Sequence, residues 1–289
     1  MTGRSPLVEC PRDAFQGLPR PVPTDRKIAH LLLLVEAGFQ RIDFGSFVSR
    51  KAVPQMADSR EVAAALPRDR GVEWIAIVAN ERGAGEAASC AVPVAGFPLS
   101  VNDTFQRRNA GKDLASTWPM LERIAGELRG TETRLAVYLS MAFGNPYGEP
   151  HDPDRAVEFA RRLGDLGVRE ISLADTVGAA GPEAIAPVFR AVAAAVPGAE
   201  VGLHLHQTPS RWEAVVRAAM NTGCRRFDGA LGGIGGCPFA GDDMVANLPT
   251  EGLVPLLRQA GYDPGVEESR LAECVASARA LARLGGAHG

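Results

Sequence analysis

The stretch Val201-Gly202-Leu203-His204-Leu205-His206-Gln207-Thr208-Pro209 decides how the rest of the chain is interpreted. Apolar residues lead into it, which is typical of the end of a buried strand. Side chains two residues apart point to the same face of a strand, so His204 and His206 are expected to project together. The chain has 5 histidines, so a pair at this spacing needs an explanation. The pair is interpreted either as two ligands of one cation or as two ordinary core or solvated histidines.

The size and composition of the chain limit the classes of protein it can belong to. Its 289 residues, 46% of them hydrophobic, can bury a full core. This length suits two small domains or one α/β barrel, for which about 250 residues is typical. A formal net charge of −3 without a basic block argues against nucleic acid as a partner. The apolar run 31–35 is far shorter than the roughly 20 residues of a membrane span, and we expect no signal peptide.

The cysteines indicate a reducing compartment. The 5 cysteines are odd in number, widely spaced and form no CxxC pair. A disulfide framework or a structural zinc site is therefore not expected, and the cytoplasm is the predicted location.

Apolar strands alternate with helical patterns along the chain. Strands are expected at 6–10, 39–43, 74–79, 90–95, 135–140 and 170–175, then at the His204–His206 segment and at 226–229. Helices are expected at 24–34, 58–66, 114–128, 153–166, 182–196, 212–220, 249–260 and 267–285, whereas 80–89 is expected to be a short crossover, tight for a full helix. Eight alternating units predict an α/β fold closed into a (β/α)8 TIM barrel with extra C-terminal helices. We expect one catalytic domain over 1–289, with the barrel at about 6–262 and a C-terminal helical segment at about 263–289.

Polar residues follow several of these strands, where ligands bind in α/β folds. Asp13 follows the first strand, and Asn247 lies in the last loop. One carboxylate, the two imidazoles and an amide oxygen would suit Mg²⁺ or Mn²⁺, with Zn²⁺ as an alternative. We therefore predict a metal site formed by Asp13, His204, His206 and Asn247.

A glycine-rich segment, Gly232 to Gly241, follows the eighth strand. Its 5 glycines predict a mobile loop that can close on a ligand. Cys237 within this loop is interpreted as a proton carrier or nucleophile, or as an idle thiol. The loop lacks a following Lys-Ser pair and does not follow the first strand, so a nucleotide-binding loop is rejected.

Five segments together resemble the hydroxymethylglutaryl-CoA lyase family of the DRE-TIM metallolyase superfamily. They are Pro11-Arg12-Asp13 with Gln16, the segment from Ser46 to Asp58, the segment from Glu170 to Gly178, the segment from His204 to Thr208, and the segment from Gly232 to Ala240 with Asn247-Leu-Pro-Thr-Glu251. The resemblance implies a divalent metal on Asp13, His204, His206 and Asn247, and an acyl-CoA thioester as substrate. It implies that Arg12 steadies the thioester oxygen and that Cys237 shuttles a proton. Asp43, where the family keeps an acidic residue, or a metal-bound water is the leading candidate for the hydroxyl base.

Other residues of these segments are expected at the substrate. Gln16, Asp175, Thr176 and Asn145 are the candidate substrate-binding residues. The chain departs from the family pattern at several of these places: Asp43 replaces a glutamate, Gln207 an aspartate, Asn145 a cysteine and Cys10 a glycine. The metal ligands are retained while their surroundings differ, so the identity of the substrate is affected more than the chemistry.

The function predicted on this basis is cleavage of hydroxymethylglutaryl-CoA, or a related 3-hydroxy-3-substituted acyl-CoA, to acetyl-CoA and a 3-oxo acid. Three alternatives remain: a Claisen-type synthase, a 2-oxo acid aldolase that ignores CoA, and a metal-binding homologue with altered catalysis. Arg107, Arg108 and Lys112 are interpreted either as a contact for CoA phosphates or as a solvated surface. The sequence allows a homodimer without requiring one.

Overall fold

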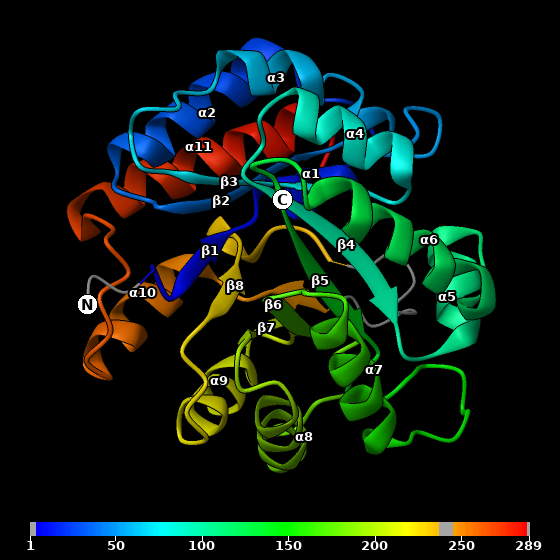
Figure 1. The fold of residues 1–289 in the computed structure, drawn as a ribbon. Coiled ribbons are helices and arrows are strands. Elements are labelled where there is room, and N and C mark those ends of the chain that lie inside the picture. The colour runs from blue at the N-terminus through cyan, green and yellow to red at the C-terminus, as the bar shows by residue number, and fades with distance from the viewer. Residues whose placement is uncertain (1–3, 237–244, 288–289) are drawn as a thin grey trace.

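The computed structural model describes residues 4–236 and 245–287. Eight strands, all paired in parallel, run in the order β6-β5-β4-β3-β2-β1-β8-β7, and β6 also pairs with β7. This last pairing closes the sheet, so the predicted (β/α)8 barrel is confirmed (Figure 1). The barrel strands are β1 (Leu7–Glu9), β2 (Arg41–Ser46), β3 (Glu73–Ile77), β4 (Val94–Ser100), β5 (Arg134–Ser140), β6 (Glu170–Asp175), β7 (Glu200–Gln207) and β8 (Phe227–Gly229).

Helices surround the barrel on its outside, as Figure 1 shows. They are α1 (Pro11–Gln16), α2 (Thr24–Glu36), α3 (Ser59–Ala65), α4 (Glu81–Ser89), α5 (Asp103–Ala110), α6 (Leu114–Leu128), α7 (Pro153–Asp165), α8 (Pro182–Ala195), α9 (Trp212–Met220), α10 (Thr250–Gln259) and α11 (Leu271–Leu284). Short 3₁₀ turns are η1 (Pro54–Met56), η2 (Leu231–Gly233) and η3 (Glu268–Arg270). The main apolar core fills the layer between the strands and these helices. No helix of the described chain is long and apolar enough to cross a membrane.

The segment 80–95 differs from the sequence-based expectation. Residues 81–89 form the full helix α4, because the side chain of Asn80 accepts the backbone N–H of Gly83 at 2.9 Å and caps it. The turn after α4 uses Cys90 and Ala91, the latter at φ 51°. The fourth strand consequently begins at Val94 and not at Cys90, so the predicted bounds were wrong.

The prediction also lacked α5, η1 and η2, and it lacked two elements at the carboxyl end of the barrel. Pro11–Gln16 forms a helical turn directly after β1, with proline at its start where its missing N–H costs nothing. Ala246–Asn247 forms β9, which pairs antiparallel with β7 and aligns Asn247 with His206. Both elements bring polar side chains to the carboxyl end of the barrel.

A network of buried charges closes the opposite end of the barrel. Arg41, which is 2% exposed, pairs with Glu73, Glu170 and Glu200, at distances from 2.9 to 3.0 Å. Arg4 and Arg134 join the same glutamates from the rim. Above it, Val8, Cys10, Ile75, Val94 and Ala136 form a small apolar cluster. Charged and apolar side chains thus occupy this end of the barrel, and ligands of such barrels bind at the carboxyl end.

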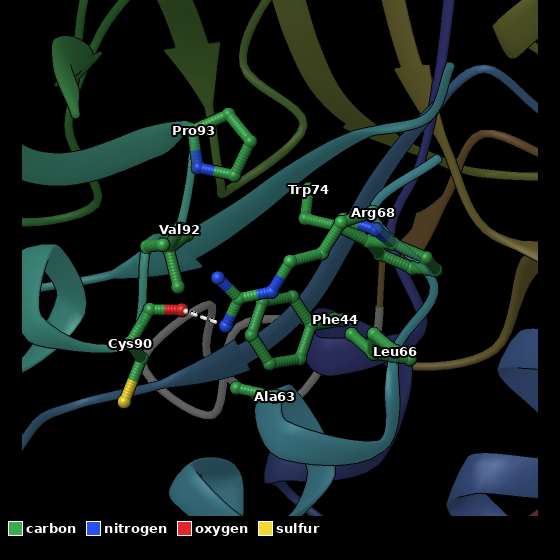
Figure 2. A pocket seen from close by; sticks show the side chains of 9 residues that line it. Phe44, Ala63, Leu66, Arg68, Trp74, Cys90, Val92 and Pro93 are labelled. Atoms are coloured by element: carbon green, nitrogen blue, oxygen red, sulfur yellow. Dashed lines mark hydrogen bonds between the residues drawn. The ribbon is translucent and has the colours of Figure 1, made fainter. Parts of the chain in front are cut away.

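Among the cavities of the described chain, two lie outside the barrel. One of about 20 Å³ lies where β3 and β4 begin, beside Phe44 and Trp74, and there Arg68 donates to the carbonyl of Cys90 at 3.1 Å (Figure 2). The other, of about 310 Å³, lies between α7 and α8 and is lined mainly by apolar side chains. Neither is lined by the polar residues that follow the strands.

Candidate metal and catalytic site

Three side chains from distant parts of the sequence converge at the carboxyl end of the barrel. His204 and His206 come from β7, and Asp13 comes from α1. Their ligand atoms all lie within 4.8 Å of one another, and all three residues are buried. Nε2 of His206 lies 3.2 Å from Nε2 of His204 and 3.4 Å from Oδ2 of Asp13. The two imidazoles and the carboxylate therefore share one focus, which we call the Asp13–His204–His206 cluster.

Asp13 is held in place by neighbours that leave it ionised. Its Oδ1 accepts from Nη1 of Arg12 at 2.7 Å and from Nε2 of Gln16 at 2.8 Å. Its Oδ2 accepts from Nδ2 of Asn247 at 2.8 Å. Burial alone would raise the pKa of the Asp13 carboxyl, but Arg12 and His206 bring that pKa well below its ordinary value.

The cluster fits a divalent cation. Neutral imidazole nitrogens and a carboxylate oxygen are ligands for Zn²⁺, Mn²⁺ and, through the oxygen, Mg²⁺. Two imidazole nitrogens 3.2 Å apart need a proton or a cation between them, because two lone pairs facing each other repel. Asn247 presents its amide nitrogen to Asp13 and to the carbonyl of Ile234. Its amide oxygen would face the same cation only if the side-chain amide were flipped by about 180°.

Arg12 joins the cluster to Asp43 on β2. Nε and Nη2 of Arg12 both donate to Oδ2 of Asp43, at 3.0 and 2.5 Å. Arg12 is 7% exposed and Asp43 is 0% exposed. Burial raises the pKa of Asp43 to about 6, although Arg12 pulls it downwards. Oδ1 of Asp43 has no hydrogen-bond partner within the described chain, which leaves it available to another group.

Asp228 on β8 is a member of the site that the sequence did not reveal. Its Oδ2 lies 3.2 Å from Nδ1 of His204, on the side of the ring away from His206. Asp228 is 1% exposed, and its neighbour Arg226 is 2% exposed. The only available signal was an Arg-x-Asp spacing in an apolar strand, which places both side chains on one face.

The four residues expected at the substrate have different surroundings. Gln16 hydrogen-bonds to Asp13. Asp175 accepts the backbone N–H groups of residues 177, 179 and 180, so it shapes the loop after β6. The hydroxyl of Thr176 is buried and has no hydrogen-bond partner among the described residues. Asn145 is bonded within its own loop, to the backbone of Tyr147 and Glu149.

Two other positions complete the comparison with the sequence. Gln207 points away from the cluster and donates to Oδ2 of Asp175 at 3.3 Å and to the carbonyl of Ala180 at 3.1 Å. An aspartate there, as in the family pattern, would bring a second carboxylate towards Asp175. Cys237, the predicted proton carrier, lies outside the described residues.

Comparison with known proteins identifies the family. A family model described as HMGL-like matches residues 9–277. The chain belongs to the HMGL-like family. The resemblance deduced from the five sequence segments is thereby confirmed.

The relatives of this HMGL-like chain include proteins named for different activities. It is 34% identical to the hydroxymethylglutaryl-CoA lyase of Pseudomonas mevalonii, over 96% of this chain and 91% of that protein. It is 35% identical to the (R)-citramalyl-CoA lyase of Chloroflexus aurantiacus, over 90% of this chain and 85% of that protein. A solved structure of an HMG-CoA lyase from Acinetobacter baumannii, in complex with coenzyme A and 3-methylmalate, superposes with a TM-score of 0.90 at 31% identity, covering 98% of this chain and 93% of that one. These relatives are lyases that differ in the acyl group named.

Proposed function

We propose that this chain is a divalent-metal-dependent carbon–carbon lyase. It cleaves hydroxymethylglutaryl-CoA, or a related 3-hydroxy-3-substituted acyl-CoA, to acetyl-CoA and a 3-oxo acid. The observation that carries the proposal is the Asp13–His204–His206 cluster beside the buried Arg12–Asp43 ion pair. The named activities of the relatives support the same class of reaction.

The proposed metal ligands are Asp13, His204, His206 and Asn247. Mg²⁺ or Mn²⁺ is the proposed ion, and Zn²⁺ is the alternative. A bound cation lowers the pKa of the tertiary hydroxyl of the substrate and orients it for cleavage. Gln16 and Arg12 hold Asp13 at Oδ1, so Oδ2, which accepts from Asn247 here, is the oxygen that would bind the ion.

The proposed catalytic residues are Arg12, Asp43 and Cys237. The departing acetyl-CoA enolate carries negative charge, which a fixed guanidinium at Arg12 offsets. Asp43 fixes Arg12, and its pKa of about 6 suits a group that accepts the proton of the hydroxyl near neutral pH. Cys237 is proposed to return a proton to the enolate.

The proposed substrate contacts are Gln16, Asp175, Thr176 and Asn145. Thr176 has the strongest support, because its buried hydroxyl lacks a described partner. Asp175 and Asn145 would reach a substrate only after breaking hydrogen bonds to the backbone of their own loops. Two of the three basic residues considered for CoA phosphates already have partners. Arg107 pairs with Asp103, and the guanidinium of Arg108 lies 4.6 Å from the centroid of the Tyr147 ring. A CoA phosphate would have to displace these contacts.

A cytoplasmic location is also proposed. The cysteines of the described chain, Cys10, Cys90, Cys224 and Cys274, are all free. Free thiols are the rule in a reducing compartment.

An assay with purified protein tests the function and separates it from its alternatives. With Mg²⁺ or Mn²⁺, we expect acetyl-CoA release from at least one member of a panel of 3-hydroxy-3-substituted acyl-CoA thioesters. A chelator should abolish the release, and added metal should restore it. Cleavage of CoA-free acids would indicate the aldolase, and condensation of acetyl-CoA with a 2-oxo acid would indicate the synthase. Metal binding without turnover of any thioester would overturn the proposal in favour of an altered homologue.

A further inference from the structure

A row of polar residues lies inside the barrel, one level below the Asp13–His204–His206 cluster. Tyr138 of β5 aligns with Ser172 of β6, and Ser172 aligns with Gly202 of β7. Arg226, at the start of β8, lies across Gly202. A Cβ at position 202 would come within 2.8 Å of Cδ and 2.9 Å of Cγ of Arg226. Glycine inside a strand weakens it unless another group needs the space, and here that group is the Arg226 side chain.

Arg226 and Asp228 form an ion pair in the barrel interior. Nη2 of Arg226 lies 3.4 Å from Oδ1 of Asp228. Asp228 is the acidic partner of Arg226 among the ion pairs of the described chain. A charge that is removed from water needs such a partner, since an unpaired buried charge strongly destabilises the folded state. The pair is an electrostatic contact and not a hydrogen bond, because Oδ1 of Asp228 and Nε, Nη1 and Nη2 of Arg226 have no hydrogen-bond partner within the described residues. The hydroxyls of Tyr138 and Ser172 also lack one, so these groups are suited to ordered water.

The second oxygen of Asp228 extends this pair to His204. Oδ2 lies 3.2 Å from Nδ1 of His204, while Nε2 of His204 is the atom that faces His206. A carboxylate only accepts hydrogen bonds, so the Nδ1 of His204 must carry the proton. The lone pair of the ring then sits on Nε2, directed at the cluster. The ring of Tyr138 packs edge-on against His204, at 5.7 Å between centroids, and restricts its rotation.

We propose that Arg226 is a positioning residue for the metal centre: it holds Asp228 so that His204 presents Nε2 to the cation. The proposal rests on the metal site of the proposed function. It assigns a role to Arg226, Asp228 and Gly202, which lie one level below the Asp13–His204–His206 cluster. The test of this proposal measures metal affinity, so a negative result can be distinguished from a negative result in the lyase assay.

Variants of Arg226 test the proposal by titration with Mn²⁺ alone. Arg226→Met should weaken Mn²⁺ binding about tenfold or more, in the range found when outer partners of metal ligands are removed. Arg226→Lys should restore part of the loss, because it keeps the charge. Arg134→Met, which removes an arginine from the network at the other end of the barrel, should leave the Kd within about twofold. A folded Arg226→Met protein with the wild-type Kd would overturn the proposal.

A double variant shows whether Arg226 acts through Asp228. Arg226→Met combined with Asp228→Asn leaves no unpaired charge in the barrel, so it is the safer variant to fold. We expect it to bind Mn²⁺ no more weakly than Asp228→Asn alone, since residues that act as one unit are not additive. Fully additive losses would contradict the coupling.

A measurement on the wild-type protein tests the His204 geometry that the proposal requires, and it does not depend on whether the variants fold. Selective ¹⁵N labelling of the 5 histidines gives few enough imidazole signals to read the tautomer of His204 in metal-free protein. The expected tautomer has its proton on Nδ1 and its lone pair on Nε2. A His204 protonated on Nε2 alone would refute the proposed positioning.

Discussion

Arg12 and Asp43 form a buried ion pair in which two N–H groups of the guanidinium, Nε and Nη2, converge on one carboxylate oxygen, Oδ2. The third contact of Arg12, through Nη1, reaches Asp13 in the metal cluster. One guanidinium thus orients the proposed metal ligand and the proposed base at once. A planar fork of donors can do this, whereas a single ammonium group cannot.

The first prediction follows from this geometry. Arg12→Lys should lower kcat for thioester cleavage about 10²- to 10³-fold, as expected when a donor to a developing oxyanion is lost. The Kd for Mn²⁺ should also rise, by about tenfold, because Nη1 of Arg12 donates to the proposed ligand Asp13 and a lysine ammonium cannot keep both of its carboxylate contacts. Steady-state kinetics and a Mn²⁺ titration measure the two effects. Retention of full kcat would remove Arg12 from the mechanism.

The second prediction concerns His206. His206→Gln should abolish measurable Mn²⁺ binding and turnover together, since the cluster loses one of its two imidazoles. His151→Gln is the matched control, because His151 is exposed on the loop before α7. Calorimetric titration and the thioester assay should show wild-type values for the control. Tight metal binding by His206→Gln would place the ion elsewhere.

The third prediction concerns Gln207, where the chain departs from the family pattern. Gln207→Glu replaces a donor by an acceptor opposite the carboxylate of Asp175 and the carbonyl of Ala180. We expect it to lower the free energy of unfolding by about 1–3 kcal/mol, the cost of leaving buried acceptors without a donor. The same change at the exposed Gln259 should stay within about 0.5 kcal/mol. Urea denaturation compares the two, and equal effects would contradict the role given to Gln207.

The fourth prediction is a pH dependence of stability that comes from Glu9. Glu9 is 1% exposed and accepts from the hydroxyl of Thr250 and from the N–H of Leu231 at 3.0 Å. Burial raises its pKa from 4.5 to about 8, although these hydrogen bonds act in the opposite direction. Between pH 4.5 and about 8 the folded state therefore binds more protons than the unfolded state, so the free energy of unfolding falls as the pH rises.

Comparison of wild type with Glu9→Gln isolates this contribution. The wild type should lose stability relative to the variant by up to roughly 1.4 kcal/mol per pH unit across that interval. Urea denaturation at a series of pH values measures the difference. Parallel stability curves would show that Glu9 does not titrate in this range.

Much of the architecture could be predicted from local patterns. The alternation of strands and helices, the barrel, and the expectation that Asp13, His204 and His206 meet all follow from periodicity and from parallel strands ending at one face. The errors in the predicted bounds also had local causes. The helix at 81–89 depends on capping by Asn80, and the strand that follows begins later because the turn uses Cys90 and Ala91.

Roles that depend on contacts across the barrel could not be predicted in this way. In the sequence, Asp228 and Arg226 are two residues of an ordinary short strand. Only the closed sheet brings Asp228 to His204 and Arg226 to Gly202. Conversely, Asp175 and Asn145 were predicted to contact the substrate, yet their side chains are engaged by their own loops.

The sequence by itself determined the order of the elements, the closed barrel and the identity of the groups that could bind a cation, because these depend on residue type and on periodicity along the chain. Only the tertiary structure decided which atoms face one another: that Arg12 spans Asp13 and Asp43, and that Asp228, paired with Arg226, faces Nδ1 of His204. Hydrogen-bond partners in a barrel come from strands far apart in the chain, and their distances are set by the register and closure of the sheet.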